Sequence, residues 1–235
     1  MSREDLYVTS KISPYEQGSE KALRACENIL ERLDIGYLDL VLIHWPGVAK
    51  QQLQSPDNAG KRYETWKVME QFHDKGLFKA IGVSNFEIDH LKGLLDTCTI
   101  KPLVNQIECH PKYPQDDVRS FCRDHSIQVV AYSCYGAGAL FDKEKYPEVY
   151  QVADETGKTP AQVLLCWGLE HGCCVLAKSD QEDRIREISP NNQHMQPIST
   201  DEGVCHYLGA EHYGMLCGLS SSGTEKFCWD PSTVL

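Results

Sequence analysis

The sequence predicts an α/β fold of the barrel type, in which parallel strands alternate with helices. Three observations support this prediction: six apolar runs recur along the chain, amphipathic segments separate them, and every run closes on polar residues. Runs of about four to eight aliphatic and β-branched residues without strict alternation are typical of strands buried on both faces. Strands that alternate with helices indicate βαβ units and a parallel sheet.

The predicted strands follow the apolar runs in order. They span residues 6–11, 37–45, 78–85, 103–108, 127–133 and 175–179. The first helix is predicted over 17–34, because its apolar residues fall on one side of a helix with about 3.6 residues per turn. These residues are Ala22, Leu23, Ala25, Cys26, Ile29, Leu30 and Leu33.

Two further helices have clear signals at their ends. One is predicted over 61–75 and stops at Gly76; its helical rhythm comes from Trp66, Met69, Glu70, Phe72 and His73. The other is predicted over 159–171, with Thr159 as N-cap, Pro160 as the first helical residue and Gly172 as the stop. Proline in the first turn and glycine after the last are the usual positions of these residues.

Polar side chains finish all six predicted strands. They are Lys11, His44, Ser84 with Asn85, Gln106 with Glu108, Tyr132 with Ser133, and Lys178 with Ser179. The carboxyl ends of parallel strands form the active-site face of a barrel, and they line the ligand crevice of an open doubly wound sheet. A glycine-rich nucleotide-binding fingerprint does not follow the first run, so the barrel is favoured.

Composition excludes several classes of protein. Of the 235 residues, 41% are hydrophobic and 24% charged, as in globular proteins, and the net charge of −11 disfavours nucleic acid or an anionic membrane as a partner. Any anionic ligand therefore needs a local cluster of donors. No apolar run is long enough to span a membrane, and the chain starts with a charged segment rather than a signal peptide. The 11 cysteines are accordingly interpreted as reduced thiols, and the location as cytoplasmic.

The strand–helix pattern stops near Pro190. We therefore expect a barrel region over residues 1–188 and a C-terminal extension over residues 189–235. Ser199 and Glu202 have the spacing of a capping box in this extension, which also contains a Gly/Ser stretch, GLSSSG.

Several stretches together resemble the aldo-keto reductase family. In family order they read LYVTSKI, YLDLVLIHWPG, GLFKAIGVSNF, VNQIECHP, VVAYS, KTPAQVLLCW, VLAKS with DRIRE, and KFCWDP. The resemblance covers residues 3 to 188 and the tail. It implies an eight-stranded (β/α) barrel that reduces aldehydes and ketones with NADPH, with a tetrad of Asp, Tyr, Lys and His at its active site.

Two members of that tetrad have counterparts here. Lys11 matches the lysine, whose charge lowers the pKa of the acidic tyrosine, and His44 matches the histidine, which orients the substrate carbonyl. The segment with the Asp and the Tyr has no counterpart, so we expect the chain to lack the first two βα units. Since loss of a general acid costs about 10² to 10⁴ in rate, the activity of this chain is in doubt.

The resemblance also implies an NADP(H) site. Ser84, Asn85 and Gln106 match the residues that bind the nicotinamide carboxamide, and the strand end Tyr132–Ser133 carries the ring that stacks on the nicotinamide. Lys178, Ser179 and Arg184 match the group that holds the adenosine 2′-phosphate, which favours NADP over NAD. Ile188 stands where many members have an asparagine that faces the adenine.

Other residues have competing interpretations. Trp45, Tyr135 and Trp229 are candidate walls of the substrate pocket or simply packed aromatics, and Tyr135 is a less favoured replacement for the missing acid. Cys109, His110, Cys122 and His125 have a loosely zinc-like spacing, but the family uses no metal there, so no metal site is predicted. The pair Cys173–Cys174 is interpreted as the start of a buried strand rather than a redox pair.

An incomplete barrel has physical consequences. Six strands cannot close an eight-stranded barrel, so strands 7–11 and 175–179 would have free edges that invite self-association. The full-length family is expected to be monomeric and to act on a small-molecule carbonyl substrate. Three alternatives stay open: a reductase whose longer form is active, a non-catalytic NADP(H)-binding protein, and a truncated isoform without a function of its own.

Overall fold

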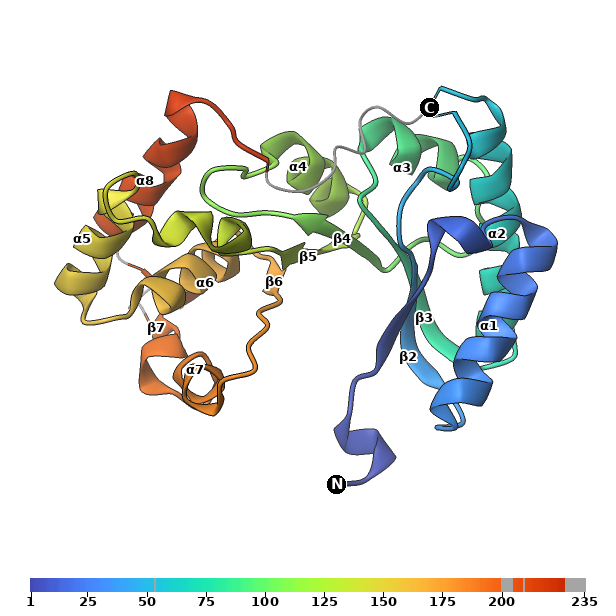
Figure 1. The fold of residues 1–235 in the computed structure, drawn as a ribbon, viewed down its shortest axis with the longest axis horizontal. Helices are drawn as coiled ribbons and strands as arrows, with labels where there is room; N and C mark the ends of the chain where they lie inside the picture. Colours follow the sequence, from blue (N-terminus) through green and yellow to red (C-terminus); the bar gives the residue numbers. More distant parts are fainter. Residues whose placement is uncertain (53, 200–204, 209, 227–235) are drawn as a thin grey trace. The chain divides into compact units, whose positions relative to one another are not determined.

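The structure, a computed structural model, describes residues 1–52, 54–199, 205–208 and 210–226. These residues form two compact units. The first comprises residues 1–107 and 117–128, and the second comprises residues 108–116 and 129–226 of the described chain. Each unit contains parallel strands that alternate with helices (Figure 1).

The first unit is built on four parallel strands in chain order. They are β1 (Thr9–Ile12), β2 (Leu38–Ile43), β3 (Phe78–Ser84) and β4 (Val104–Glu108). Lys11 pairs with Leu42, Leu42 with Gly82, and Ser84 with Gln106, so the strands end near one level. Gly82 is required in this ladder, because a Cβ there would lie 2.7 Å from the Val104 carbonyl oxygen.

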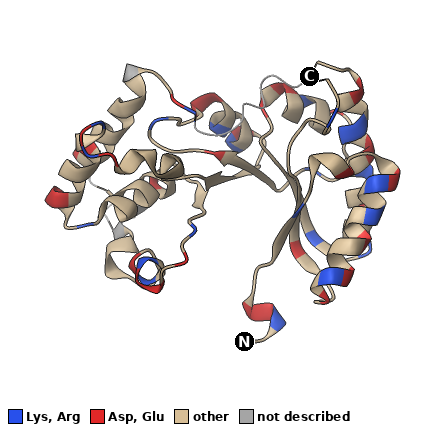
Figure 2. Ribbon diagram, in the orientation of Figure 1, with Lys and Arg blue, Asp and Glu red and all other residues tan. Residues whose placement is uncertain are grey.

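Helices connect these strands. They are α1 (Ser19–Leu33), α2 (Asp57–Asp74), α3 (Ile88–Leu95) and α4 (Asp116–Asp124), with the short 3₁₀ turns η1 (Arg3–Asp5) and η2 (Pro14–Glu16). Trp66 of α2 is fully buried, and Phe72 stacks on Phe78 of β3 with ring centroids 5.1 Å apart. Figure 2 shows acidic and basic residues interspersed along α1 and α2, where Lys61 and Glu64 form one of the ion pairs.

The second unit contains all of β5 (Gln128–Tyr132) except its first residue, and β5 pairs in parallel with β6 (Cys174–Val175). Its helices are α5 (Pro147–Thr156), α6 (Pro160–Glu170), α7 (Glu182–Glu187) and α8 (Ala210–Cys217), with 3₁₀ turns η3 (Gly136–Phe141), η4 (Gln193–Met195) and η5 (Gly218–Ser222). Strands β7 (Ile198–Ser199) and β8 (Cys205–His206) form an antiparallel pair. The predicted cap of α6 is confirmed, because the Thr159 side chain accepts a hydrogen bond from the Gln162 backbone.

Some predicted elements are wrong in detail. The strand expected over 175–179 is only Cys174–Val175, because β5 ends at Tyr132 and the left-handed φ of 51° at Ser133 turns the chain away from the ladder. Ser199 lies in β7 and not at a helix start, while Glu202 lies outside the described residues. The helix expected to start at 61 starts at Asp57, after Pro56.

The predicted burial is also corrected at several positions. Leu23 and Leu33 of α1 are 39% and 43% exposed, because Ala22, Ala25 and Cys26 are the residues of that helix that reach the core. Cys173 is buried and Cys174 is exposed, so the expected strand start is only half buried, and both thiols are free. None of the helices within the described residues is long and apolar enough to cross a membrane. The boundary expected at residue 188 stays a prediction.

Candidate functional site

The first unit places a lysine and a histidine at the ends of adjacent strands. Lys11 lies near the end of β1, and His44 directly follows β2, where its backbone N–H donates to the Ile12 carbonyl at 3.0 Å. Both side chains are half-buried. Burial lowers the pKa of Lys11; burial and the nearby Lys11 charge lower the pKa of His44. The Lys11 charge therefore acts on the His44 imidazole, and the assignment of the two residues to one site stays a prediction.

Strands β3 and β4 add three buried polar residues, Ser84, Asn85 and Gln106. The Ser84 hydroxyl donates to the Gln106 carbonyl at 2.7 Å, and the Asn85 backbone N–H donates to the same oxygen at 2.9 Å. Asn85 has a left-handed φ of 63°, and its side-chain Nδ2 donates to the His44 carbonyl at 2.9 Å. These bonds fix the ends of β2, β3 and β4 relative to one another.

Trp45 continues this cluster. Its ring stacks on that of His44, with centroids 6.0 Å apart. The Gln17 side chain donates to the carbonyls of Trp45 at 2.7 Å and of Gly47 at 2.9 Å, so the loop after β2 is held against the N-terminal part of the unit. Trp45 is half-buried, in agreement with either of the roles expected for it.

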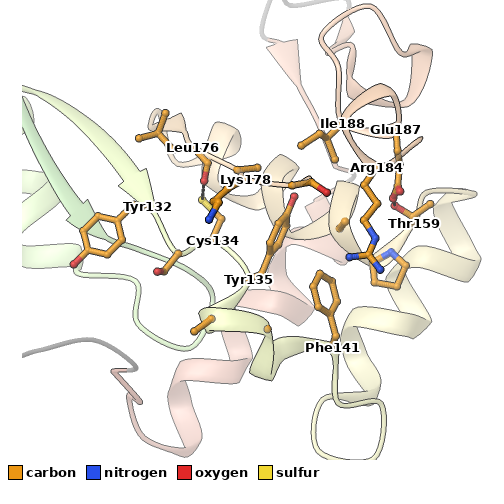
Figure 3. A pocket seen from close by; sticks show the side chains of 17 residues that line it. Tyr132, Cys134, Tyr135, Phe141, Thr159, Leu176, Lys178, Arg184, Glu187 and Ile188 are labelled. Atoms are coloured by element: carbon orange, nitrogen blue, oxygen red, sulfur yellow. Dashed lines mark hydrogen bonds between the residues drawn. The ribbon is translucent and has the colours of Figure 1, made fainter. Parts of the chain in front are cut away.

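The second unit contains a pocket with a volume of about 780 Å³. The end of β5, η3, the start of α6, the segment after β6 and α7 line it (Figure 3). Tyr132, Ser133, Tyr135, Lys178, Ser179, Arg184 and Ile188 are the sequence-predicted residues among its lining. The apolar side chains of Phe141, Pro160 and Leu176 also line it. Four further residues line it that no sequence pattern marks: Cys134, Phe141, Leu176 and Glu187. The Gly-Ala-Gly at 136–138 does signal the irregular loop that ends at Phe141.

Two of the pocket's cations have no protein partner among the described residues. Within the described residues, neither the Lys178 nor the Arg184 side chain forms an ion pair or a hydrogen bond, although the neighbouring Arg186 pairs with Glu182 at 2.5 Å. Ser179 lies beside Lys178, and its hydroxyl accepts from the Gln181 backbone at 3.0 Å. In a protein with a net charge of −11, two unpaired cations beside an apolar pocket make a local site for an anion.

Glu187 and Tyr135 are the acidic and the phenolic residue of the pocket. The Thr159 hydroxyl donates to the Glu187 carboxylate, and the Gln162 side chain donates to the Glu187 carbonyl at 2.8 Å, so α6 fixes the end of α7. Burial makes the largest contribution to a raised pKa of Tyr135, and the nearby Cys134 and Glu187 raise it further. A phenol that holds its proton more firmly is a poorer acid, which argues against Tyr135 as the proton donor.

The predicted site residues thus fall into two groups, each described in its own unit. One group lies at the strand ends of the first unit and consists of Lys11, His44, Ser84, Asn85 and Gln106. The other group lines the pocket of the second unit and consists of Tyr132, Ser133, Tyr135, Lys178, Ser179 and Arg184. Trp229 lies outside the described residues. Within the described residues no group of three or more His, Cys, Asp or Glu could hold a metal ion.

Comparison with known proteins gives a consistent result. The model of the aldo/keto reductase family matches residues 1–199. Glyoxal reductase of Bacillus subtilis is 42% identical over 187 residues, which are 80% of this chain and 63% of that protein. The chain thus spans less than two thirds of the length of this relative.

Solved structures agree with the sequence match. The aldose reductase of Schistosoma japonicum has a TM-score of 0.77 and 32% identity, over 96% of this chain and 72% of its own. The silkworm aldo-keto reductase AKR2E5, complexed with NADPH, has a TM-score of 0.77 and 29% identity, over 100% of this chain and 68% of its own. The predicted fold class is confirmed: parallel strands alternate with helices, as in the (β/α)8 barrels of these relatives.

Proposed function

Because this chain belongs to the aldo/keto reductase family, we propose that it is an NADP(H)-dependent oxidoreductase, or a major part of one, that reduces aldehydes or ketones to alcohols. One observation supports the cofactor most directly: Lys178 and Arg184 line an apolar pocket without a protein partner among the described residues. Two cations can form charge-assisted hydrogen bonds to the 2′-phosphate that distinguishes NADP from NAD.

Each unit has residues that match a part of such a cofactor. In the second unit, we propose that Lys178, Ser179 and Arg184 hold the 2′-phosphate and that the strand end Tyr132–Ser133 carries the ring that stacks on the nicotinamide. Ser84, Asn85 and Gln106 bind the carboxamide; their backbone and side-chain bonds at the strand ends support this role by making them rigid. When bound, NADPH supplies the hydride that reduces the carbonyl carbon.

Lys11 and His44 act on the substrate side of the proposed reaction. The His44 imidazole is neutral at physiological pH, because burial and Lys11 lower its pKa, so a ring N–H can donate to the substrate carbonyl oxygen. As the family resemblance implies, the proton that completes the alcohol would come from a tyrosine with no counterpart among residues 1–235, and the Lys11 ammonium would lower the pKa of that tyrosine. The raised pKa of Tyr135 makes this residue a poorer proton donor.

A cofactor titration followed by a turnover assay tests this proposal. NADPH fluorescence is titrated against the full chain, and then consumption of NADPH is measured with a reactive aromatic aldehyde. Lys11→Met and Lys21→Met are compared, since Lys21 is an exposed lysine of α1 away from the strand ends. Turnover that Lys11→Met alone removes supports the reductase. NADPH binding without turnover favours a non-catalytic NADP(H)-binding protein, and absence of binding refutes both.

We further propose a cytoplasmic location. All cysteines that the structure characterises are free thiols, including the buried Cys26, Cys122 and Cys166. Burial raises the pKa of Cys26 to about 12 and that of Cys166 to about 11, so these thiols are protonated and unreactive at neutral pH. Fractionation of cells that express the native chain tests the location; recovery in a secreted fraction would contradict it.

A further inference from the structure

The loop that follows β2 is bound by side chains from three other parts of the first unit. Each carbonyl oxygen from residue 44 to residue 47 accepts a hydrogen bond from a side-chain nitrogen. The donors are Asn85 Nδ2 to His44 at 2.9 Å, Gln17 Nε2 to Trp45 at 2.7 Å and to Gly47 at 2.9 Å, and Arg62 Nη1 to Pro46 at 2.9 Å. Pro46 and Gly47 are buried, so protein donors replace water as the partners of their carbonyls.

Gln17 bridges two carbonyls of this loop with one amide group. It lies between η2 and α1 and is 2% exposed. Both acceptors are carbonyl oxygens, so only the amide nitrogen, with its two N–H groups, can face them. The amide oxygen is then buried without a hydrogen-bond partner among the described residues, which costs free energy. This cost offsets part of the stabilisation from the two bonds, whereas their effect on the shape of the loop is undiminished.

The groups that hold the loop are themselves anchored on α2. Next to Gln17, the Gly18 backbone N–H donates to the Thr65 hydroxyl of this helix at 2.8 Å. Arg62 also lies on α2, and burial lowers its pKa to about 10, so it stays charged at neutral pH and its bond to the Pro46 carbonyl is charge-assisted. The loop after β2 is therefore tied both to α2 and to the segment that enters α1.

The loop carries the two side chains of the proposed substrate side. The rings of His44 and Trp45 stack with centroids 6.0 Å apart and planes inclined by 30°. Because both side chains are attached to the backbone that Gln17 and Asn85 bind, a displacement of the carbonyls at 44–47 changes the direction of both rings. A displacement of about 1 Å at a reacting group can cost about 100-fold in rate. The geometry of this loop thus bears directly on how the imidazole meets a substrate carbonyl.

We propose that Gln17 is a positioning residue of the reductase site: its two hydrogen bonds hold the loop that aims the His44 imidazole and the Trp45 indole at the substrate. This inference rests on the proposed reductase function and adds to it a residue that acts through the backbone of others. The hydrogen bonds of the Gln17 side chain reach none of the residues assigned to NADP(H), so we expect cofactor affinity to be independent of it.

The test follows the tryptophan rings by fluorine NMR of the full chain labelled with 5-fluorotryptophan. Trp45→Phe and Trp66→Phe assign the two signals of interest; Trp66 is fully buried in α2 and reports on the core. Gln17→Met keeps a side chain of similar length and removes both donors. Gln71→Met is the matched control, because Gln71 is an exposed residue of α2.

We expect Gln17→Met to shift and broaden the Trp45 signal, because the loop loses two of its bonds, and to leave the Trp66 signal in place. The pKa of the His44 imidazole, which burial and the Lys11 charge lower, should rise toward its ordinary value of about 6.5 in an NMR titration, because a displaced ring is more open to water. Gln71→Met should change neither readout.

A kinetic readout separates positioning from cofactor binding. If the parent chain reduces an aromatic aldehyde, Gln17→Met should lower kcat/KM about 10- to 100-fold, while the dissociation constant of NADPH changes less than about twofold. An unchanged Trp45 signal together with an unchanged His44 titration would overturn the inference. A shift of Trp45 and Trp66 together would overturn it as well, since it marks a general loss of structure. A parent chain that binds no NADPH refutes the proposed function, and the NMR readouts then still decide whether Gln17 positions the loop.

Discussion

Replacing Arg184 with methionine should weaken the binding of NADPH without affecting that of NADH. Arg184 lies on α7 at the rim of the second-unit pocket, and it has no protein partner among the described residues. Its charge is therefore available to a ligand without first breaking an ion pair. Methionine keeps an unbranched apolar side chain in the helix, so the substitution removes the charge and its hydrogen bonds with little change in helix propensity.

The expected magnitude follows from the exposure of the side chain. A hydrogen bond to a charged group contributes about 1.5–3 kcal/mol, and Arg184 is exposed, so screening by water favours the lower end. A loss of about 1.5 kcal/mol raises the dissociation constant about tenfold. Lys178 still faces the 2′-phosphate, so binding should weaken rather than disappear. NADH lacks this phosphate, and its dissociation constant should change less than about twofold.

The assay is a fluorescence titration of each dinucleotide at low and high salt. Arg186→Met is a matched control on the same helix, because Arg186 pairs with Glu182 and does not line the pocket. The tenfold difference should shrink at high salt, where charges at an exposed site are screened. Equal losses for NADPH and NADH, or equal losses for the two arginine variants, would refute the assignment of Arg184 to the 2′-phosphate.

Three further predictions concern the first unit. Asp39→Asn should destabilise the chain by about 1–2 kcal/mol in urea unfolding at pH 7, because the carboxylate accepts from the Val8 backbone and from Arg3, both at 2.7 Å. These bonds lower the pKa of Asp39. The difference in stability between the two chains should therefore be present above the unfolded pKa near 3.9 and vanish as the pH falls through the folded pKa. Asn85→Ala should lower stability by about 1–3 kcal/mol in the same assay, since it removes the bond to the His44 carbonyl and forces alanine into the left-handed region, and wild-type stability would contradict this. Thr9→Pro should reduce concentration-dependent self-association in sedimentation velocity, because among the described strands β1 pairs only with β2. The Val8 carbonyl accepts from β2 and the Ile12 carbonyl from His44, which directly follows β2, so Thr9 lies at the free edge. A monomer at all concentrations before substitution would refute edge pairing.

The sequence predicts the first unit more accurately than the second. The apolar runs locate β2, β3 and β4 to within a few residues, because these strands are buried and burial requires an uninterrupted run of apolar residues. The strand predicted over 175–179 is longer than the observed β6, because β6 can extend only as far as β5 pairs with it, and β5 ends where Ser133 adopts a left-handed φ. The sequence around residue 175 does not contain this information, since the limit is set by another strand.

The same contrast holds for the candidate site. Polar residues at strand ends are visible as breaks in apolar runs, which is why Lys11, His44 and Asn85 could be singled out. Phe141 and Glu187 could not, because they reach the pocket through an irregular loop and a short helix whose course is set by tertiary contacts. Their apolar or acidic character alone does not distinguish them from ordinary surface residues.

The bond between Thr159 and Glu187 has a consequence for how sequence changes alter this pocket. It joins the first residues of α6 to the end of α7, and Arg184 lies on the same six-residue helix. A short exposed helix has little stability of its own, so its orientation depends on such an anchor. Substituting Thr159 with valine would leave the Gln162–Glu187 bond as the remaining link between the two helices, so the orientation of the arginine one helical turn away would change while every cation of the pocket stays in place.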